Sequence, residues 1–257
     1  MLQALSCENL ALSVPGRTLC RGVSIAIAPG EMWAVLGRNG SGKTTLLHTL
    51  AGLRHQEDGR VRLNGRPVNS RAERERAQEI GLLLQHEEGR FWGSVREYVL
   101  LGRFPHASPW SGWGSEDEEA ARAALDAVAL AALAGRRFET LSGGERQRAR
   151  IAQLVAQAPH FYLLDEPLQH LDLNHQVRTL ALFRRLARRT ERGIAMVLHD
   201  ALWPGRYCTH ALLLQDDGEA RAGPARDMLT RDNLERLYGC RLTELGDGEG
   251  SYFVPHV

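Results

Sequence analysis

The sequence predicts an α/β fold in which helices cover a mainly parallel β-sheet. Short apolar runs of strand length alternate with helical patterns in both end portions of the 257-residue chain, and such alternation is typical of parallel sheets. Between these portions, residues from 94 to about 157 form a long alanine-rich helical pattern. We therefore expect one domain over residues 1–257. Residues 1–90 and 158–257 would form its α/β core with a C-terminal tail, and residues 91–157 an inserted helical subdomain.

The expected strands of the N-terminal portion are short and apolar, and lie at residues 5–12, 23–28, 32–36, 60–63 and 80–84. The first two flank a turn at Pro15-Gly16-Arg17, which predicts an antiparallel layer. A glycine-rich loop and a helix at residues 43–51 follow the third strand. The fourth strand ends at Asn64-Gly65, a strong hairpin signal.

The alternation resumes after the helical stretch, which is itself interrupted by a Pro/Ser/Gly/Trp loop at residues 107–115. We expect strands at residues 161–164, 194–198 and 211–214 and a helix at residues 174–189. The basic residues of 174–192 are interpreted as a solvated helix face, because the formal net charge of the chain is only +1. That charge gives no general attraction to nucleic acid or anionic lipid, so no nucleic-acid partner is expected.

Several compositional features predict a cytosolic protein. No apolar run approaches the length that spans a bilayer, and Met1-Leu2-Gln3 lacks the pattern of a signal peptide. The four cysteines show no CxxC spacing, which argues against a disulfide framework or a zinc site. Among 32 lysine and arginine residues, Lys43 is the single lysine, and it stands where a broad guanidinium would not replace a compact ammonium.

A phosphate-binding loop is predicted between the strand at 32–36 and the helix at 43–51. The segment reads Gly37-Arg38-Asn39-Gly40-Ser41-Gly42-Lys43-Thr44-Thr45 and matches G-x-x-x-x-G-K-[ST]. Glycines let successive N–H groups face a phosphate, and the helix N-terminus adds its dipole. We expect this segment to bind nucleotide, with Lys43 on the β- and γ-phosphates and the Thr44 hydroxyl on Mg²⁺. A chance match is the alternative, and the strand–loop–helix context argues against it.

Two carboxylates follow the strand at 161–164. Asp165 at the strand end is placed to hold Mg²⁺, and Glu166 lies one residue farther out, where it can polarise an attacking water. A strand that ends in Asp-Glu is by itself often only a strand that enters a loop. The upstream phosphate loop favours the functional interpretation.

The segment Leu141-Ser142-Gly143-Gly144-Glu145 precedes a predicted helix. Taken alone it is an N-cap, but it also spells the signature of ATP-binding cassette (ABC) proteins. The chain resembles ABC transporter ATPase subunits over essentially its whole length. The resemblance implies a P-loop NTPase (RecA-like) core, with ATP and Mg²⁺ as cofactors and ATP hydrolysis coupled to transport as the activity.

The resemblance also implies roles for other residues. Gln85 corresponds to the glutamine that senses Mg²⁺ and water, Asp172 to the D-loop aspartate, and His199 to the histidine that contacts the γ-phosphate. In that family the signature residues of one subunit bind the ATP held by the opposite subunit. This chain has one phosphate loop and one signature, so a homodimer with ATP is expected.

The match departs from the family in two places. Most relatives carry an aromatic residue before the first turn that stacks on adenine, whereas Ser13-Val14-Pro15-Gly16 offers none. Arg17 could lie on the ring instead, and we expect only a modest preference for ATP over GTP. After Pro167 the family usually has small hydroxyl residues, where this chain has Leu168 and Gln169.

Two further segments, 101–106 and 171–176, are similar to the ATPases of bacterial importers for ferric siderophores, haem and cobalamin. Such importers imply two permease subunits in the membrane, a periplasmic binding protein, and a peripheral location on the cytoplasmic face of the inner membrane. We expect the permease to dock on the surface after Gln85, toward Arg103 and the loop of Trp110 and Trp113. Loop packing is the favoured interpretation of those two tryptophans.

Two other functions stay open at this point. A soluble ABC ATPase of DNA repair or translation is one, although repair types separate the motif halves by long coiled coils and ribosomal types carry two cassettes. A regulatory module without turnover is the other, and Glu166 and His199 argue against it. The sequence does not specify the cargo.

Overall fold

The computed structural model describes residues 3–14, 16–56, 58–85, 91–108, 112–246 and 251–256. Its centre is a six-stranded sheet with the strand order β10-β9-β3-β8-β7-β6. Neighbours from β9 to β6 run parallel, and only the edge strand β10 is antiparallel. The strands are β3 (Met32–Gly37), β6 (Ile80–Leu83), β7 (Phe161–Leu164), β8 (Gly193–Val197), β9 (His210–Leu214) and β10 (Ala220–Pro224). The predicted α/β class with a mainly parallel sheet is confirmed.

A second, antiparallel sheet has the order β2-β1-β4-β5 and confirms the predicted N-terminal layer. It consists of β1 (Leu5–Val14), β2 (Arg17–Ile27), β4 (Arg60–Leu63) and β5 (Arg66–Pro67). Strand β2 begins at Arg17, six residues before the predicted start (23 − 17 = 6), because Val14 pairs directly with Arg17 across a tight turn. Asn64 and Gly65 have φ values of 53° and 78°, which is the pair of positive angles that a type I′ hairpin requires.

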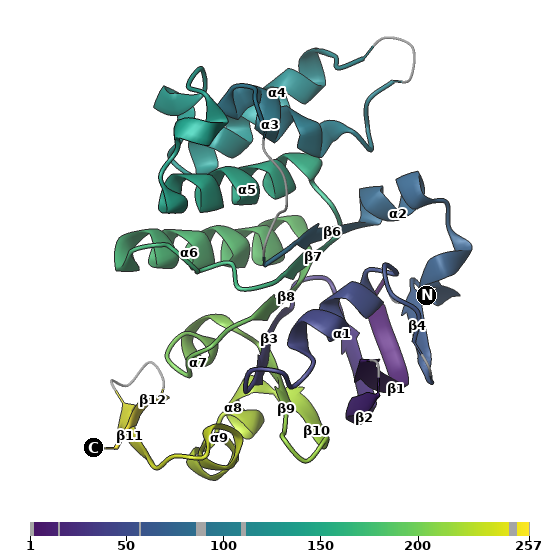
Figure 1. The fold of residues 1–257 in the computed structure, drawn as a ribbon, viewed down its shortest axis with the longest axis vertical. Coiled ribbons are helices and arrows are strands. Elements are labelled where there is room, and N and C mark those ends of the chain that lie inside the picture. Colours follow the sequence, from purple (N-terminus) through teal and green to yellow (C-terminus); the bar gives the residue numbers. More distant parts are fainter. Residues whose placement is uncertain are drawn as a thin grey trace.

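The segment predicted to be helical contains α3 (Val95–Leu100), α4 (Ser115–Ala127) and α5 (Gly143–Gln157), with short 3₁₀ turns between them. These helices lie together at one end of the molecule (Figure 1). Gly102 lets the turn after α3 touch α5, since a Cβ there would lie 2.1 Å from the Gln153 carbonyl oxygen. The exact limits of the helical subdomain stay a prediction.

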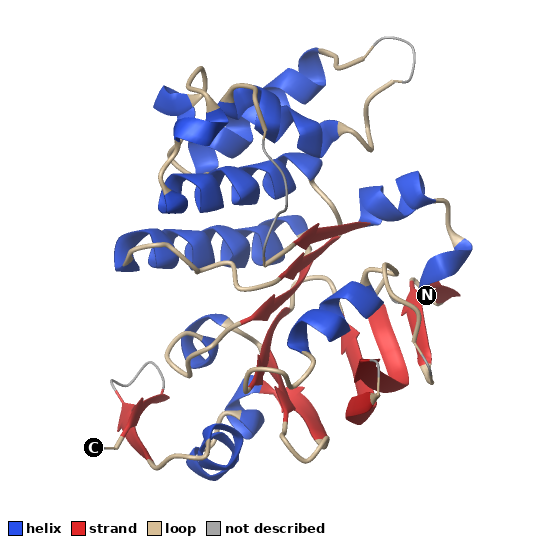
Figure 2. Ribbon diagram, viewed as in Figure 1, coloured by secondary structure: helices blue, strands red, loops and turns tan. Residues whose placement is uncertain are grey.

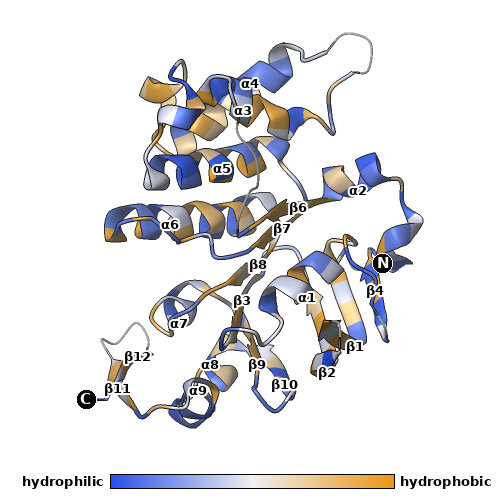
Figure 3. Ribbon diagram, viewed as in Figure 1, coloured by the Kyte–Doolittle hydropathy of each residue, from blue (hydrophilic) through white to orange (hydrophobic). Residues whose placement is uncertain are grey.

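Two apolar cores lie on the two faces of the central sheet. One joins the antiparallel sheet and α1 (Lys43–Leu50) to the sheet. The other joins the helical segment, α6 (Leu173–Thr190) and the C-terminal helices to it. Every residue of β3, β7 and β8 is buried, as expected for strands covered on both faces, and helices flank the sheet in Figure 2. These strands are mostly hydrophobic in Figure 3.

Several elements were not predicted, and most of them are short and have few buried residues. They are α2 (Glu73–Glu79), which has no buried residue, β10, α7 (Pro204–Tyr207), α8 (Ala225–Met228), α9 (Arg231–Tyr238) and the hairpin of β11 (Leu242–Gly246) and β12 (Ser251–Pro255). The four cysteines are free. Within the part of the chain that the structure describes, no helix combines the length and apolarity needed to cross a membrane.

Candidate nucleotide-binding site

The phosphate-loop segment connects the carboxyl end of β3 to the first turn of α1. Gly40 and Gly42 have φ values of 81° and 102°, angles that favour glycine. Gly37 has no room for a side chain, because a Cβ would lie 2.4 Å from the Ser41 hydroxyl oxygen. The Lys43 ammonium donates to the carbonyl oxygens of Gly37 at 2.8 Å and Arg38 at 2.9 Å. Burial lowers the pKa of Lys43, and the nearby carboxylates oppose that shift.

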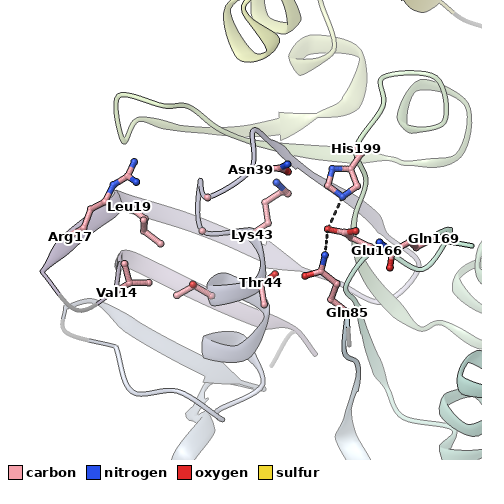
Figure 4. A pocket seen from close by; sticks show the side chains of 13 residues that line it. Val14, Arg17, Leu19, Asn39, Lys43, Thr44, Gln85, Glu166, Gln169 and His199 are labelled. Atoms are coloured by element: carbon pink, nitrogen blue, oxygen red, sulfur yellow. Dashed lines mark hydrogen bonds and ion pairs between the residues drawn. The ribbon is translucent and has the colours of Figure 1, made fainter. Parts of the chain in front are cut away.

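A cavity of about 660 Å³ opens over this loop. Residues 39, 40 and 42–45 of the loop line it, together with Arg17, Gln85, Glu166 and His199 from distant parts of the sequence. Figure 4 shows Lys43, Glu166, Gln85 and His199 pointing into one space, with Arg17 at its opposite end. The structure therefore brings together most of the residues that the sequence predicted for the site.

Asp165 is buried beside the loop. Its side chain is 1% exposed, and neither carboxylate oxygen has a hydrogen-bond partner of normal geometry. Burial raises the pKa of Asp165, while the neighbouring Thr44 hydroxyl and the Lys43 charge limit the rise. A buried carboxylate next to a hydroxyl and a phosphate-binding loop is the kind of oxygen ligand that Mg²⁺ takes.

Glu166 occupies a strained backbone position, with a φ of 52°. Such a conformation persists in a non-glycine residue only where the surroundings fix it, and it is frequent at functional sites. The Gln85 amide donates to Glu166 Oε1 at 2.8 Å, and His199 Nε2 lies 2.6 Å from the same oxygen. Both contacts are the dashed lines of Figure 4.

The base end of the cavity lacks an aromatic wall among the described residues that line it. Val14 and Leu19 line this end together with Arg17, as Figure 4 also shows. Sequence reasoning named Arg17 but missed Leu19. The alternating pattern of β2, in which Arg17 and Leu19 share one face, is the signal that could have indicated it.

The signature segment lies outside the cavity: none of residues 141–145 lines it. The segment caps α5, since Ser142 Oγ accepts from the Glu145 amide at 3.3 Å and Glu145 Oε2 accepts from the Ser142 amide at 2.8 Å. Gly144 is needed because a Cβ would lie 2.9 Å from the His170 carbonyl oxygen. Asp172 is also outside the cavity, where it caps α6 through His175.

Known proteins provide close matches. A family model described as ABC transporter matches residues 20–169. Ferric enterobactin transport ATP-binding protein FepC of Escherichia coli is 38% identical over 240 residues, which are 93% of this chain and 89% of that protein. Hemin import ATP-binding protein HmuV of Burkholderia thailandensis is 37% identical over 270 residues, 98% of this chain and 99% of that protein.

Solved structures give the same result. A structure described as an inward-facing metal-chelate type ABC transporter matches with a TM-score of 0.86 at 31% identity, over 99% of this chain and 98% of that one. The dimeric structure of MJ0796, a bacterial ABC transporter cassette, matches with a TM-score of 0.76 at 25% identity, over 86% of this chain and 99% of that one.

Proposed function

The chain belongs to the ABC transporter family and is one of its ATP-hydrolysing subunits, and we propose that it powers a bacterial importer of an iron–siderophore complex or haem. The observation that carries the catalytic part is the contact of Gln85 and His199 with one oxygen of Glu166 above the phosphate loop. The cargo part is supported by the ferric enterobactin and hemin import relatives. Cobalamin stays a third candidate cargo from the sequence resemblance alone.

The phosphates bind to the loop of residues 37–45. The Lys43 ammonium holds two loop carbonyls, and an arriving β- or γ-phosphate competes for the same donors as a stronger acceptor because it is charged. The N-terminus of α1 adds the positive end of its dipole. Lys43 therefore both shapes the empty loop and binds the phosphates.

Mg²⁺ fits the site, and Asp165, Thr44 and Gln85 would hold it. The fit rests on the buried carboxylate of Asp165, whose oxygens have no hydrogen bond of ordinary geometry among the described residues and lie beside the Thr44 hydroxyl, since Mg²⁺ is bound in proteins by one or two carboxylates together with substrate phosphates. The ion would offset negative charge on the phosphate oxygens.

Glu166 acts as the general base. Its carboxylate takes a proton from a water aligned with the γ-phosphate. The Gln85 amide and His199 Nε2 both hold Oε1, which orients the carboxylate and keeps it within the cavity. His199 and Gln85 are also placed to contact the γ-phosphate and the attacking water once nucleotide enters.

A second copy of the chain completes the site. Residues 141–145 cap α5 and do not line the cavity of their own subunit, so we infer that the γ-phosphate meets the signature, and the Asp172 loop, of another copy. The dimeric MJ0796 cassette supports this arrangement. Each homodimer would then enclose two ATP molecules at two equivalent sites of one interface.

The permease would dock on an apolar groove between the helical segment and the core. A cavity of about 290 Å³ is lined by residues that include Leu84, Leu101, Phe104 and Pro105, and Phe104 is 75% exposed. Trp110 lies outside the described residues, and Trp113 is 40% exposed.

Arg103 lies next to this groove in the chain, between Gly102 and Phe104, which both line it. Its half-buried guanidinium pairs with Asp117 at 2.9 Å, and it donates to the Ala156 carbonyl oxygen. It therefore braces α4 against α5.

The test of the catalytic part is steady-state ATP hydrolysis by wild type and Glu166→Gln. The amide cannot accept the proton, so we expect a loss of turnover of about 10²-fold or more together with a dimer that ATP stabilises. Unchanged turnover would show that Glu166 is not the base. For the transport part, the chain is reconstituted with its permease and a periplasmic binding protein; stimulation by neither haem nor a ferric siderophore would contradict the proposed cargo.

A further inference from the structure

Three arginines on α5 hold three different segments of the chain. Each donates to main-chain carbonyl oxygens: Arg146 to Leu141 and Glu139, Arg148 to Val128 and Ala129, and Arg150 to Leu84 and Gln85. Among these contacts between described residues, only those of Arg150 reach the segment that carries Gln85. Its guanidinium reaches the Gln85 carbonyl oxygen at 3.4 Å, and the Leu84 carbonyl oxygen more closely.

Arg150 also contacts a buried amide that supports Glu166. Its Nη1 donates to Gln147 Oε1 at 3.0 Å, and Gln147 is 4% exposed. The Gln147 amide nitrogen donates to the Pro167 carbonyl oxygen at 3.1 Å and lies 3.5 Å from that of Glu166. Gln147 thus contacts the main chain directly at Glu166, whose φ is strained and positive.

The contacts form a closed ring. From Arg150 it passes through the Gln85 main chain to the Gln85 side chain, which donates to Glu166 Oε1 at 2.8 Å. It returns from the Glu166 main chain through Gln147 to Arg150. The Gln85 and Glu166 side chains are connected by two sets of hydrogen bonds in this ring. Both sets must break before the distance between the two side chains can change, so the ring fixes that distance better than a single contact.

We propose that Arg150 is a positioning residue for hydrolysis, which fixes Gln85 and Glu166 relative to each other and to α5. The proposal rests on the proposed role of Glu166 as general base. Ser142, at the start of α5, lies eight residues before Arg150 (150 − 142 = 8), or about 12 Å along a helix at 1.5 Å per residue. The helix that would contact the partner's ATP at Ser142 thereby holds the catalytic groups of its own subunit.

The test is Arg150→Leu in the full-length protein, with hydrolysis and nucleotide affinity measured separately. Misplacement of Gln85 and Glu166 is expected to lower kcat about tenfold, while the Kd of a fluorescent ATP analogue without Mg²⁺ stays within about twofold of wild type. Arg150→Gln keeps one amide donor and should lose less. It is also the variant to use if the leucine form does not fold.

Gln153→Leu is the matched control. Gln153 lies on the same helix and donates to the Tyr98 carbonyl oxygen within the helical segment, so it removes a comparable contact that does not reach Gln85. We expect its kcat to stay within about twofold of wild type. A loss equal to that of Arg150→Leu would assign the effect to a loosened α5 and overturn the proposal.

A double-mutant cycle with Gln85→Ala identifies the route. If Arg150 acts through Gln85, the two losses in kcat are strongly non-additive, whereas additive losses contradict the proposal. Measuring Glu166→Gln in parallel separates the proposed base Glu166 from the proposed positioning role of Arg150. Lost turnover in Glu166→Gln with wild-type kcat in both Arg150 variants refutes only the positioning role, and retained turnover in Glu166→Gln refutes the proposed base.

Discussion

Replacing Asp165 with asparagine should stabilise the nucleotide-free protein while it removes Mg²⁺-dependent hydrolysis. The Asp165 side chain is 1% exposed, and among the described residues its oxygens have no hydrogen bond of ordinary geometry, with the Thr44 hydroxyl as a weak neighbour that only partly stabilises the charge. A buried charged group in this state costs on the order of 1–3 kcal/mol of stability, and asparagine has nearly the same shape without the charge. For a protein of this size, each kcal/mol corresponds to a rise in Tm of roughly 2–4 °C.

The pH dependence of this gain has a definite sign. Burial raises the pKa of Asp165 in the folded protein above its ordinary value, so the folded state binds more protons than the unfolded state between the two pKa values. Wild-type stability from this group therefore falls as the pH rises through that window. The side-chain amide of the Asp165→Asn variant does not titrate, so the advantage of the variant is largest above the raised pKa and disappears below the ordinary pKa of an aspartate.

The assay is thermal and urea unfolding from pH 4 to 8 in the presence of a chelator, followed by the same measurement with Mg²⁺ and ADP. Asp227→Asn is the control, because Asp227 is exposed beside Arg226 and its replacement should change stability by less than about 0.5 kcal/mol. Added Mg²⁺ should increase the stabilisation by ADP in wild type and not in Asp165→Asn. A variant less stable than wild type at pH 7 without Mg²⁺ would refute the reasoning about the buried charge.

Three further predictions concern close packing, the base site and the single lysine. Gly102→Ala should lower the free energy of unfolding in urea by about 1–3 kcal/mol, because the new Cβ would lie 2.1 Å from the Gln153 carbonyl oxygen. Gly135→Ala is the control, because its Cβ meets nothing within 4 Å, and equal losses in the two variants would contradict this packing. Val14→Tyr should supply an aromatic ring for the adenine to stack on and lower the Kd for ATP about tenfold. In the wild type, which lacks this ring, the affinity for ATP should exceed that for GTP by less than about a hundredfold. Because burial lowers the pKa of Lys43, a larger fraction of its amine is neutral than in an ordinary lysine, so it should react with acylating reagents, and bound ATP should protect it. Mass spectrometry that finds no protection would contradict contact between Lys43 and the phosphates.

The assembly of the site could be predicted because its residues follow parallel strands. Gly37 ends β3, Asp165 and Glu166 follow β7, Gln85 follows β6, and His199 follows β8. The carboxyl ends of parallel strands meet at one edge of a sheet, where α/β proteins bind their ligands. Apolar runs mark these strand ends in the sequence, so residues far apart along the chain could be expected to converge.

The parts that could not be predicted depend on contacts to main-chain atoms, which leave no residue pattern. Arg150 and Arg103 are both arginines of a helical segment, yet Arg150 donates to the Leu84 and Gln85 carbonyl oxygens and Arg103 to that of Ala156. Gln147 gave a weak signal, since a polar residue on the apolar face of a helix needs a partner. The late elements α9 and β11 were missed because few of their residues are buried.

The position of the signature explains why one copy of the chain should not hydrolyse ATP efficiently. Its hydroxyl and glutamate are used within the subunit to cap α5, and the helix then leads to Gln147 and Arg150 beside the catalytic groups. A phosphate bound by the partner at the Ser142 end would add contacts at the N-terminus of the same helix, where an anion is stabilised. Occupancy of one site would thereby order the base of the other. Hydrolysis should then rise with ATP concentration more steeply than binding to a single site allows, and the Hill coefficient should be lower in Arg150→Leu than in wild type. An unchanged Hill coefficient in that variant would show that α5 does not connect the two sites.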